Sequence, residues 1–212
     1  MKRLILLILL LAPVFASGQK RVYIRKDEFR DDIYLVERNG EIEAYFQLDM
    51  PSPYDSLFLL VTKKNCQEIH DYMEDLLDTY HRWSRTAKSN HVKDFKKDFD
   101  IDPPLVRFRW MERIKEPITY GYVKYNEYFT PEDKWLAPYF SVNNIGHCNI
   151  FTRIALVPTD PEYSGKYSSL VPINDNDISL IIRWTTDFKT LERTYNRKKP
   201  KMTNAEINAL FD

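Results

Sequence analysis

Hydrophobic and polar residues alternate along much of the chain, which is the period of a β-strand with one buried face. Two alternating arms, 33–37 and 42–48, flank Asn39-Gly40. Because both residues of this pair tolerate the positive φ angles of a tight turn, the sequence predicts a β-hairpin. The second arm places its apolar residues on one face: Ile42, Ala44, Phe46 and Leu48.

Other segments carry strand patterns of different kinds. The run 57–61 is apolar at every position, which predicts a strand covered on both faces. Alternating or apolar runs predict further strands at 21–25, 105–114, 118–129, 135–142, 149–157 and 178–184. The stretch 158–176 is polar and holds three prolines, so we expect a long loop there.

One segment has the three- and four-residue spacing of an amphipathic helix. Asn65 is a candidate N-cap, and Glu68 stands three residues later in the position of a capping box. The sequence therefore predicts a main helix over about 66–88. Its apolar stripe consists of Ile69, Tyr72, Met73, Leu76, Tyr80, Trp83 and Ala87.

The C-terminal part is less clearly patterned. The stretch 185–196 suits either a helix or the return strand of a hairpin. A full capping box, Thr203 to Glu206, predicts a short C-terminal helix. Together the pattern favours an α+β fold, in which an antiparallel sheet of several strands packs with one main helix.

The first 18 residues have the order of a secretory signal. A positive Met1-Lys2-Arg3 precedes a 12-residue apolar run, 4–15, and then small residues up to Gly18. A bilayer-spanning helix needs about 20 apolar residues, so we expect a cleaved signal with the cut after Ala16 or Gly18. Position 19 is Gln rather than Cys, so no lipoprotein is expected. The rest, 19–212, is predicted to be a single globular α+β domain, exported to the periplasm or beyond, with no further membrane-spanning segment.

Composition excludes several functions. The chain has 31 basic and 31 acidic residues, and removing Lys2 and Arg3 leaves 29 basic residues against 31 acidic ones. Nucleic-acid binding usually requires a basic excess, so no nucleic-acid partner is expected. The glycines are too scattered for a phosphate-binding loop, and no G-x-S-x-G or H-E-x-x-H motif occurs, so no cofactor is predicted.

The chain has two cysteines, Cys66 and Cys148, which allow one intramolecular disulfide. Export would make that bridge possible. The alternative is two buried thiols that pack as small apolar groups. The neighbouring pair His147-Cys148 does not predict a nucleophile and its base, because adjacent strand residues point to opposite faces.

Metal motifs are incomplete. Asp98, Asp100 and Asp102 are spaced like calcium ligands, but the glycine and glutamate of an EF-hand loop are missing, as they are for Asp175, Asp177 and Ser179. A polar stripe on the main helix is interpreted as a solvated face, so no metal site is predicted. That stripe consists of His70, Glu74, Asp78, His81 and Arg85.

The remaining candidates for binding are aromatic and cationic strand residues. If the strand 105–114 has one solvated face, Arg107, Arg109 and Arg113 form a cationic row beside a tyrosine-rich strand. Aromatic residues and arginine are enriched at interfaces. The predicted binding residues are Tyr120, Tyr122, Tyr125, Trp135, Arg107 and Arg109.

These observations favour an exported, non-enzymatic domain that binds a protein or a glycan. One alternative is a hydrolase whose site is assembled from distant residues such as Asp98, Asp100 or His147, since catalytic groups converge in space rather than in sequence. A second alternative is a structural component of the cell envelope. The oligomeric state does not follow from the sequence.

Overall fold

The computed structural model describes residues 21–27, 30–48, 55–113, 125–129, 137–158 and 167–198. Within these ranges the chain forms ten antiparallel strands and three helices, so the α+β class predicted from the sequence is confirmed. The proposed signal segment and the capping box at Thr203 lie outside the described residues. None of the described helices combines the length and apolar composition needed to cross a bilayer.

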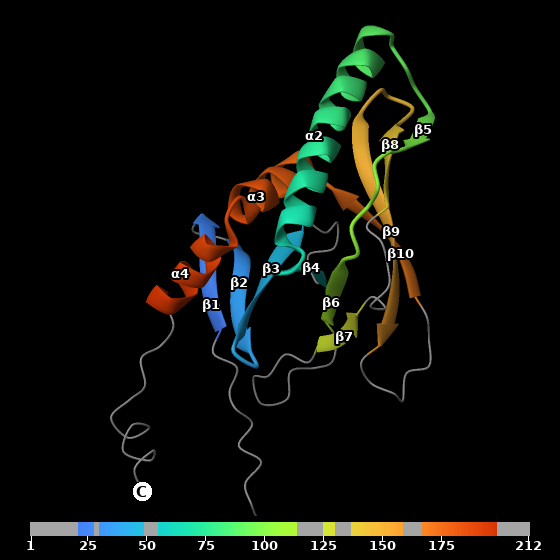
Figure 1. The fold of residues 1–212 in the computed structure, drawn as a ribbon. Helices are drawn as coiled ribbons and strands as arrows, with labels where there is room; N and C mark the ends of the chain where they lie inside the picture. Colours follow the sequence, from blue (N-terminus) through green and yellow to red (C-terminus); the bar gives the residue numbers. More distant parts are fainter. Residues whose placement is uncertain are drawn as a thin grey trace, which may run out of the picture.

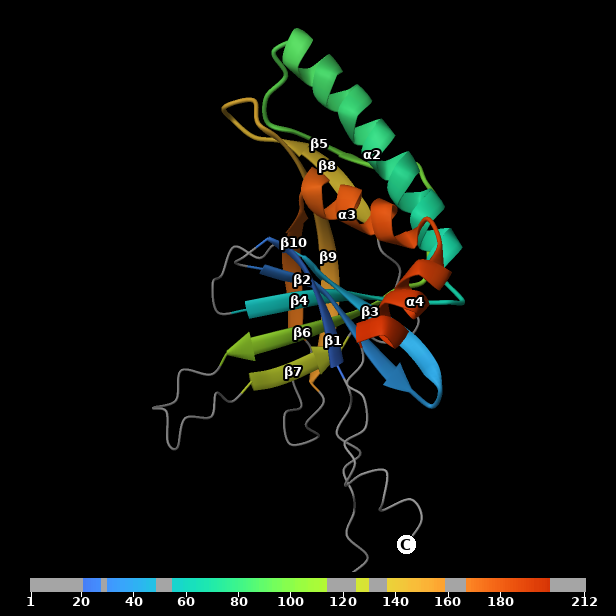
Figure 2. The same ribbon diagram turned by 90° about the vertical axis from the view of Figure 1, so that its left-hand side faces the viewer.

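Two antiparallel sheets share strand β9. The first runs in the order β1-β2-β3-β4-β6-β7 and reaches the end of β9, and the second comprises β5, β8, β9 and β10. In Figure 2, β4, β6 and β7 run across the view while β9 and β10 run up it. The strand bounds are β1 Arg21–Asp27, β2 Arg30–Arg38, β3 Glu41–Leu48, β4 Asp55–Thr62, β5 Phe95–Asp98, β6 Arg107–Arg113, β7 Tyr125–Phe129, β8 Pro138–Val142, β9 Cys148–Pro158 and β10 Tyr167–Ile173.

The predicted hairpin is present as β2 and β3. Asn39 and Gly40 have φ angles of 51° and 79°, so the turn uses the positive φ that this dipeptide tolerates. The two strands pair from Ile33 with Phe46 to Arg38 with Glu41. The fully apolar run in β4 is buried on both faces, as the sequence predicted.

The long helix α2, Cys66–Ser89, matches the predicted helix to within one residue. Its buried stripe packs on β4 and β9 and joins the main apolar core. The side chain of Asn65 makes no capping bond to the helix, and its Oδ1 instead accepts from the N–H and hydroxyl of Thr62. The predicted capping box is therefore wrong in detail, because the strand end competes for the Asn65 oxygen.

Helices α3, Asp175–Thr185, and α4, Phe188–Lys198, follow β10. Figure 1 shows α2 rising along the β5–β8 end while α3 and α4 lie toward the β1–β3 end. Helix α3 packs against α2, and both α3 and α4 contact β3. The stretch that the sequence left open between helix and hairpin is thus helical.

Two sequence predictions are corrected in this region. The expected loop at 158–176 contains strand β10, which pairs with β9 along its whole length. The expected strand at 178–184 is instead helix α3. Its N-cap is Asn174, whose Oδ1 accepts from the Asp177 N–H at 2.7 Å, and this cap stabilises a helix despite the run of isoleucines.

Candidate functional site

Helix α2 is divided by charge. Residues 66–78 carry five acidic residues and no Lys or Arg, and residues 79–89 carry Arg82, Arg85 and Lys88 with no acid. This order suits the helix dipole, which favours acids near the N-terminus and bases near the C-terminus. The acidic residues are Glu68, Asp71, Glu74, Asp75 and Asp78.

The basic character continues beyond the helix into β5. Between residues 82 and 97 the chain has six basic residues and one acid, Asp94. All six basic side chains are exposed, and we call this group the basic end of the molecule. It consists of Arg82, Arg85, Lys88, Lys93, Lys96 and Lys97.

A cleft of about 600 Å³ lies between the second half of α2 and the beginning of α3. Three members of the basic end line it, and α3 contributes Asp175. The full lining is Asp78, Tyr80, His81, Arg82, Ser84, Arg85, Lys88 and Asp175. The cleft therefore mixes cationic donors, carboxylate acceptors and one aromatic ring.

Local packing holds the cleft in place. The Tyr80 hydroxyl donates to the carbonyl of Cys148 at 3.1 Å, which ties α2 to β9. Burial raises the pKa of Tyr80, so its hydroxyl remains a donor at neutral pH. On the other side, the Asn174 cap begins α3 at Asp175 and so places that carboxylate at the rim.

Strand β5 is held against α2 by an aromatic cluster. The Trp83 ring stacks on Phe99 with centroids 5.0 Å apart, and it meets Phe140 of β8 edge-on at 5.6 Å. The Lys97 ammonium lies 4.5 Å from the centroid of the Trp83 ring. Trp83 thus positions a lysine of the basic end as well as the strand that carries it.

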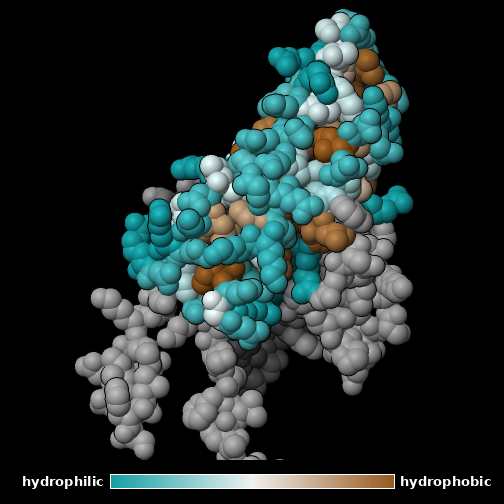
Figure 3. Space-filling view, in the orientation of Figure 1, coloured by the Kyte–Doolittle hydropathy of each residue, from teal (hydrophilic) through white to brown (hydrophobic). Residues whose placement is uncertain are grey.

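Apolar side chains are exposed beside these lysines. Phe95 on β5 is 42% exposed and Ile145 in the β8–β9 turn is 64% exposed. The two segments are neighbours, because Phe95 pairs with Val142 and the Asp94 N–H donates to the carbonyl of Asn143. On the face seen in Figure 3 the surface over α2 and α3 is mostly hydrophilic, with separate small apolar areas.

The residues predicted to bind a partner are not gathered at this cleft. Tyr120, Tyr122 and Trp135 lie outside the described residues, and of Tyr125 the structure describes the backbone in β7. Arg107 is half-buried in β6. Arg109 is buried, with 6% of its surface exposed, so it does not belong to a solvated cationic row.

Arg109 lies in a second apolar cluster, on the face of the first sheet opposite to the helices. Its Nη1 donates to the Tyr34 hydroxyl at 2.7 Å, and its guanidinium lies 5.9 Å from the centroid of the Tyr45 ring. The rings of Tyr34 and Tyr45 stack with centroids 4.5 Å apart. The alternation of β6 was identified correctly, but its second face is covered rather than solvated. The cluster consists of Tyr34, Val36, Tyr45, Phe58 and Leu60.

Of the two alternatives for the cysteines, the structure has free thiols at both Cys66 and Cys148 rather than the possible disulfide. Cys66 begins α2, whereas the carbonyl of Cys148 accepts from Tyr80, 14 residues further along the helix. Such a stretch rises about 21 Å, and a disulfide requires α-carbons within about 7 Å. The Cys66 thiol donates to the carbonyl of Thr185 at 3.3 Å.

The residues suggested for a hydrolase do not belong to the α2–α3 cleft. Asp98, Asp100 and His147 are all exposed, and none of them lines the cleft. Burial raises the pKa of the Cys66 thiol to about 11, with a smaller contribution from Asp187. Cys66 is therefore protonated at neutral pH, whereas nucleophilic chemistry requires the thiolate.

A second, smaller cavity of about 310 Å³ lies between the β2–β3 hairpin and α4. The Lys63 ammonium and the Glu192 carboxylate, both in its lining, form an ion pair at 3.5 Å. With Glu37 and Glu41 also in the lining, acidic side chains predominate there. This cavity has the opposite charge balance to the α2–α3 cleft.

The N-terminal half of α2 holds a compact set of metal-ligating atoms. One ligand atom each from His70, Asp71 and Glu74 lies within 4.8 Å of the other two. His70 and Glu74 belong to the polar stripe of the helix, which the sequence predicts to be a solvated face. His70 is instead mostly buried, with 12% of its side chain exposed.

Comparison with known protein families, curated proteins and solved structures finds no match for this chain. The site is therefore defined by its own residues. The sequence does contain one indication of this site: segment 67–78 is acidic and segment 82–97 is basic. The balanced total charge of the chain conceals this separation.

Proposed function

We propose that the protein is an exported, non-enzymatic binding protein that holds an anionic glycan in the α2–α3 cleft. The observation that carries the proposal is a cleft of about 600 Å³ lined by Arg82, Arg85 and Lys88. Pockets for small ligands usually measure about 300–1,000 Å³, which here leaves room for a small number of sugar rings.

The lining suits a sugar acid better than a purely anionic ligand. Guanidinium and ammonium groups make strong, charge-assisted bonds to carboxylate or sulfate groups. Asp78 and Asp175 accept hydrogen bonds from sugar hydroxyls, and the Tyr80 ring adds an apolar face. An exclusively polyanionic ligand such as phosphate would gain nothing from the two carboxylates.

Export is the second part of the proposal and is supported by the charge, apolar run and small residues of segment 1–18. We expect the protein purified from its native host to begin near Gln19 or Ser17. Intact mass spectrometry measures this directly. A mature protein that retains Met1-Lys2-Arg3 would contradict export by a cleaved signal.

Neutralising the cleft is expected to weaken glycan binding by about tenfold or more. The variant combines Arg82→Gln, Arg85→Gln and Lys88→Gln. Three exposed charge contacts contribute about 0.5 kcal/mol or more each, and about 1.4 kcal/mol corresponds to a factor of ten in Kd. Isothermal titration calorimetry with short heparin-derived and oligogalacturonate chains measures the effect, and neutral cello-oligosaccharides serve as the ligand control.

The matched protein control removes three exposed charges elsewhere. Arg183→Gln, Lys189→Gln and Arg193→Gln lie on α3 and α4, outside the cleft, and should leave affinity unchanged. Equal losses in both triple variants would indicate non-specific attraction and contradict the proposed site. If acidic proteins from an envelope extract bind through the cleft while every glycan fails, the ligand is a protein instead.

A further inference from the structure

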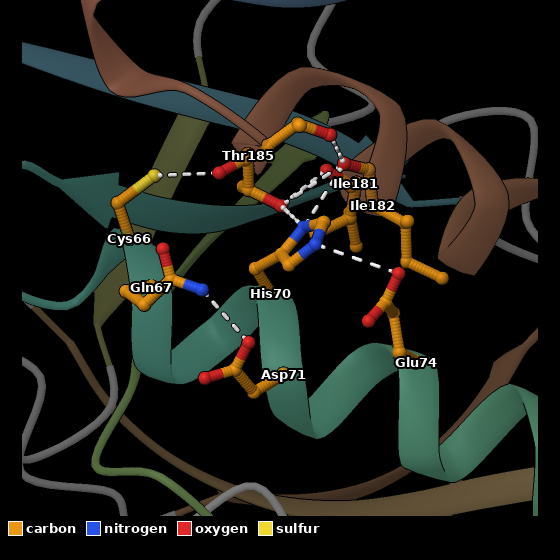
Figure 4. A network of polar contacts seen from close by, with 9 residues as sticks. Cys66, Gln67, His70, Asp71, Glu74, Ile181, Ile182 and Thr185 are labelled. Carbon is orange, nitrogen blue, oxygen red and sulfur yellow. Dashed lines mark hydrogen bonds and ion pairs between the residues drawn. The ribbon is translucent and has the colours of Figure 1, made fainter.

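His70 connects α2 to α3 through one ring nitrogen. Its Nδ1 lies 3.2 Å from the carbonyl oxygen of Ile182 and 3.1 Å from the Thr185 hydroxyl oxygen. Figure 4 shows the imidazole between the two helices, with Glu74 on its other side. The ring is thus fixed in orientation by groups that belong to another helix.

The partners of Nδ1 determine where its proton lies. A carbonyl oxygen only accepts, so Nδ1 donates to Ile182. The Thr185 hydroxyl donates its own hydrogen to the carbonyl of Ile181 at 2.7 Å, so toward His70 it also acts as an acceptor. In the neutral ring, Nε2 therefore carries a lone pair rather than a hydrogen.

The lone pair of Nε2 faces the Glu74 carboxylate. The Nε2 atom lies 3.5 Å from Oε1 of Glu74, which is long for a hydrogen bond. Two acceptors at this distance repel each other unless a proton or a metal cation lies between them. Ligands about 2.0–2.1 Å from a tetrahedral zinc are separated by roughly 3.3 Å, close to the distance observed.

A third ligand stands beside this pair. A carboxylate oxygen of Asp71 lies within 4.8 Å of one ring nitrogen of His70 and of one carboxylate oxygen of Glu74. The Gln67 amide orients the Asp71 group by donating to its Oδ1 at 2.8 Å. We propose that His70, Asp71 and Glu74 bind a divalent transition-metal ion, with zinc the best fit. An imidazole with two carboxylates selects such ions over calcium or magnesium, which prefer oxygen ligands alone.

The bond from Nδ1 to a carbonyl is the usual second contact of a metal-bound histidine, since it fixes the tautomer and the ring. Here that contact comes from α3, so α3 fixes the imidazole that would bind the ion, while all three proposed ligands belong to α2. The site is separate from the α2–α3 cleft and does not depend on the proposed glycan function.

Zinc is expected to bind the untagged, EDTA-treated protein with a stoichiometry of one and to raise its Tm. Calorimetry with ZnCl₂ measures the first, and thermal unfolding measures the second, because a ligand that binds the folded state stabilises it. Cobalt(II) should give visible d–d absorption at the same stoichiometry. These readouts require no knowledge of the biological activity.

The variants address the two exposed ligands, since His70 is buried and its replacement could unfold the helix pair. Glu74→Gln and Asp71→Asn should each weaken zinc binding by at least tenfold and remove the Tm increase. Glu68→Gln, an exposed acid two residues before His70, should bind zinc as the unaltered protein does. Absence of saturable zinc binding, or equal affinity in all three variants, would overturn the proposal.

Discussion

Replacing Trp83 with alanine is expected to lower the free energy of unfolding by about 3 kcal/mol. Truncation of a packed tryptophan usually costs about 3–5 kcal/mol, and the half-buried position of Trp83 favours the lower limit. The substitution removes the stacking on Phe99, the edge contact with Phe140 and the ring beneath Lys97. Denaturant-induced unfolding followed by circular dichroism measures the change.

The same substitution should also affect binding, because Trp83 joins β5 to α2 and both elements carry residues of the basic end. Trp83→Phe is the matched control: it retains an aromatic ring against Phe99 and should lose less than half as much stability. We expect weaker binding of anionic glycans by Trp83→Ala than by Trp83→Phe under conditions in which both are folded. A loss of stability below about 1 kcal/mol for Trp83→Ala would show that the aromatic cluster does not hold β5.

Local patterns in the sequence determined the hairpin and the long helix, and these were predictable. Asn39-Gly40 supplies the required positive φ angles, and the stripe from Ile69 to Ala87 has a helical period over about five turns. Both signals depend on neighbouring residues alone. These two elements could therefore be predicted without knowledge of their tertiary contacts.

The missed elements depend on contacts between distant segments. Strand β10 contains Pro172 and two serines, which is typical of a loop, but a strand that pairs with β9 alone among the described strands tolerates proline. Helix α3 has a β-branched run that favours a strand. Its Asn174 cap lay inside the expected loop, and its packing on α2 cannot be derived from its own residues.

One wall of the candidate cleft could be predicted from the sequence, but the other could not. Helical spacing places Asp78, His81 and Arg85 along one side of α2, but it does not indicate that α3 begins opposite them at Asp175. For the same reason the stripe was interpreted as solvated at His70, whose burial comes from α3. Composition alone could not distinguish an exposed polar face from one that another helix covers.

The burial of β4, which the sequence predicts, explains why Arg109 is not part of a solvated arginine row. Strand β4 was predicted to be covered on both faces, and β6 is its neighbour in the sheet. Arg109 pairs with Phe58 of β4, so its side chain lies on the same covered face. A buried arginine must find partners for its polar groups inside the protein, and Arg109 finds the Tyr34 hydroxyl.

Arg109→Met is therefore expected to destabilise the protein by about 2–3 kcal/mol rather than to change binding alone. Methionine fills much of the same volume, but the Tyr34 hydroxyl loses the charged donor that it now contacts at 2.7 Å. Hydrogen bonds to charged groups contribute about 1.5–3 kcal/mol, and a buried oxygen left without its donor adds a desolvation cost. The guanidinium contact with the Tyr45 ring is lost as well.

Arg107→Met on the same strand is the matched control, because Arg107 is half-buried and is expected to contribute less than about 1 kcal/mol. Urea unfolding of both variants, with the slope of the transition compared to the unaltered protein, separates lost stability from altered compactness. If both arginines belonged to one solvated binding row, both variants would keep their stability and lose affinity for a partner. Equal, small changes in stability would thus contradict the buried position of Arg109, and a loss confined to Arg109→Met would support it.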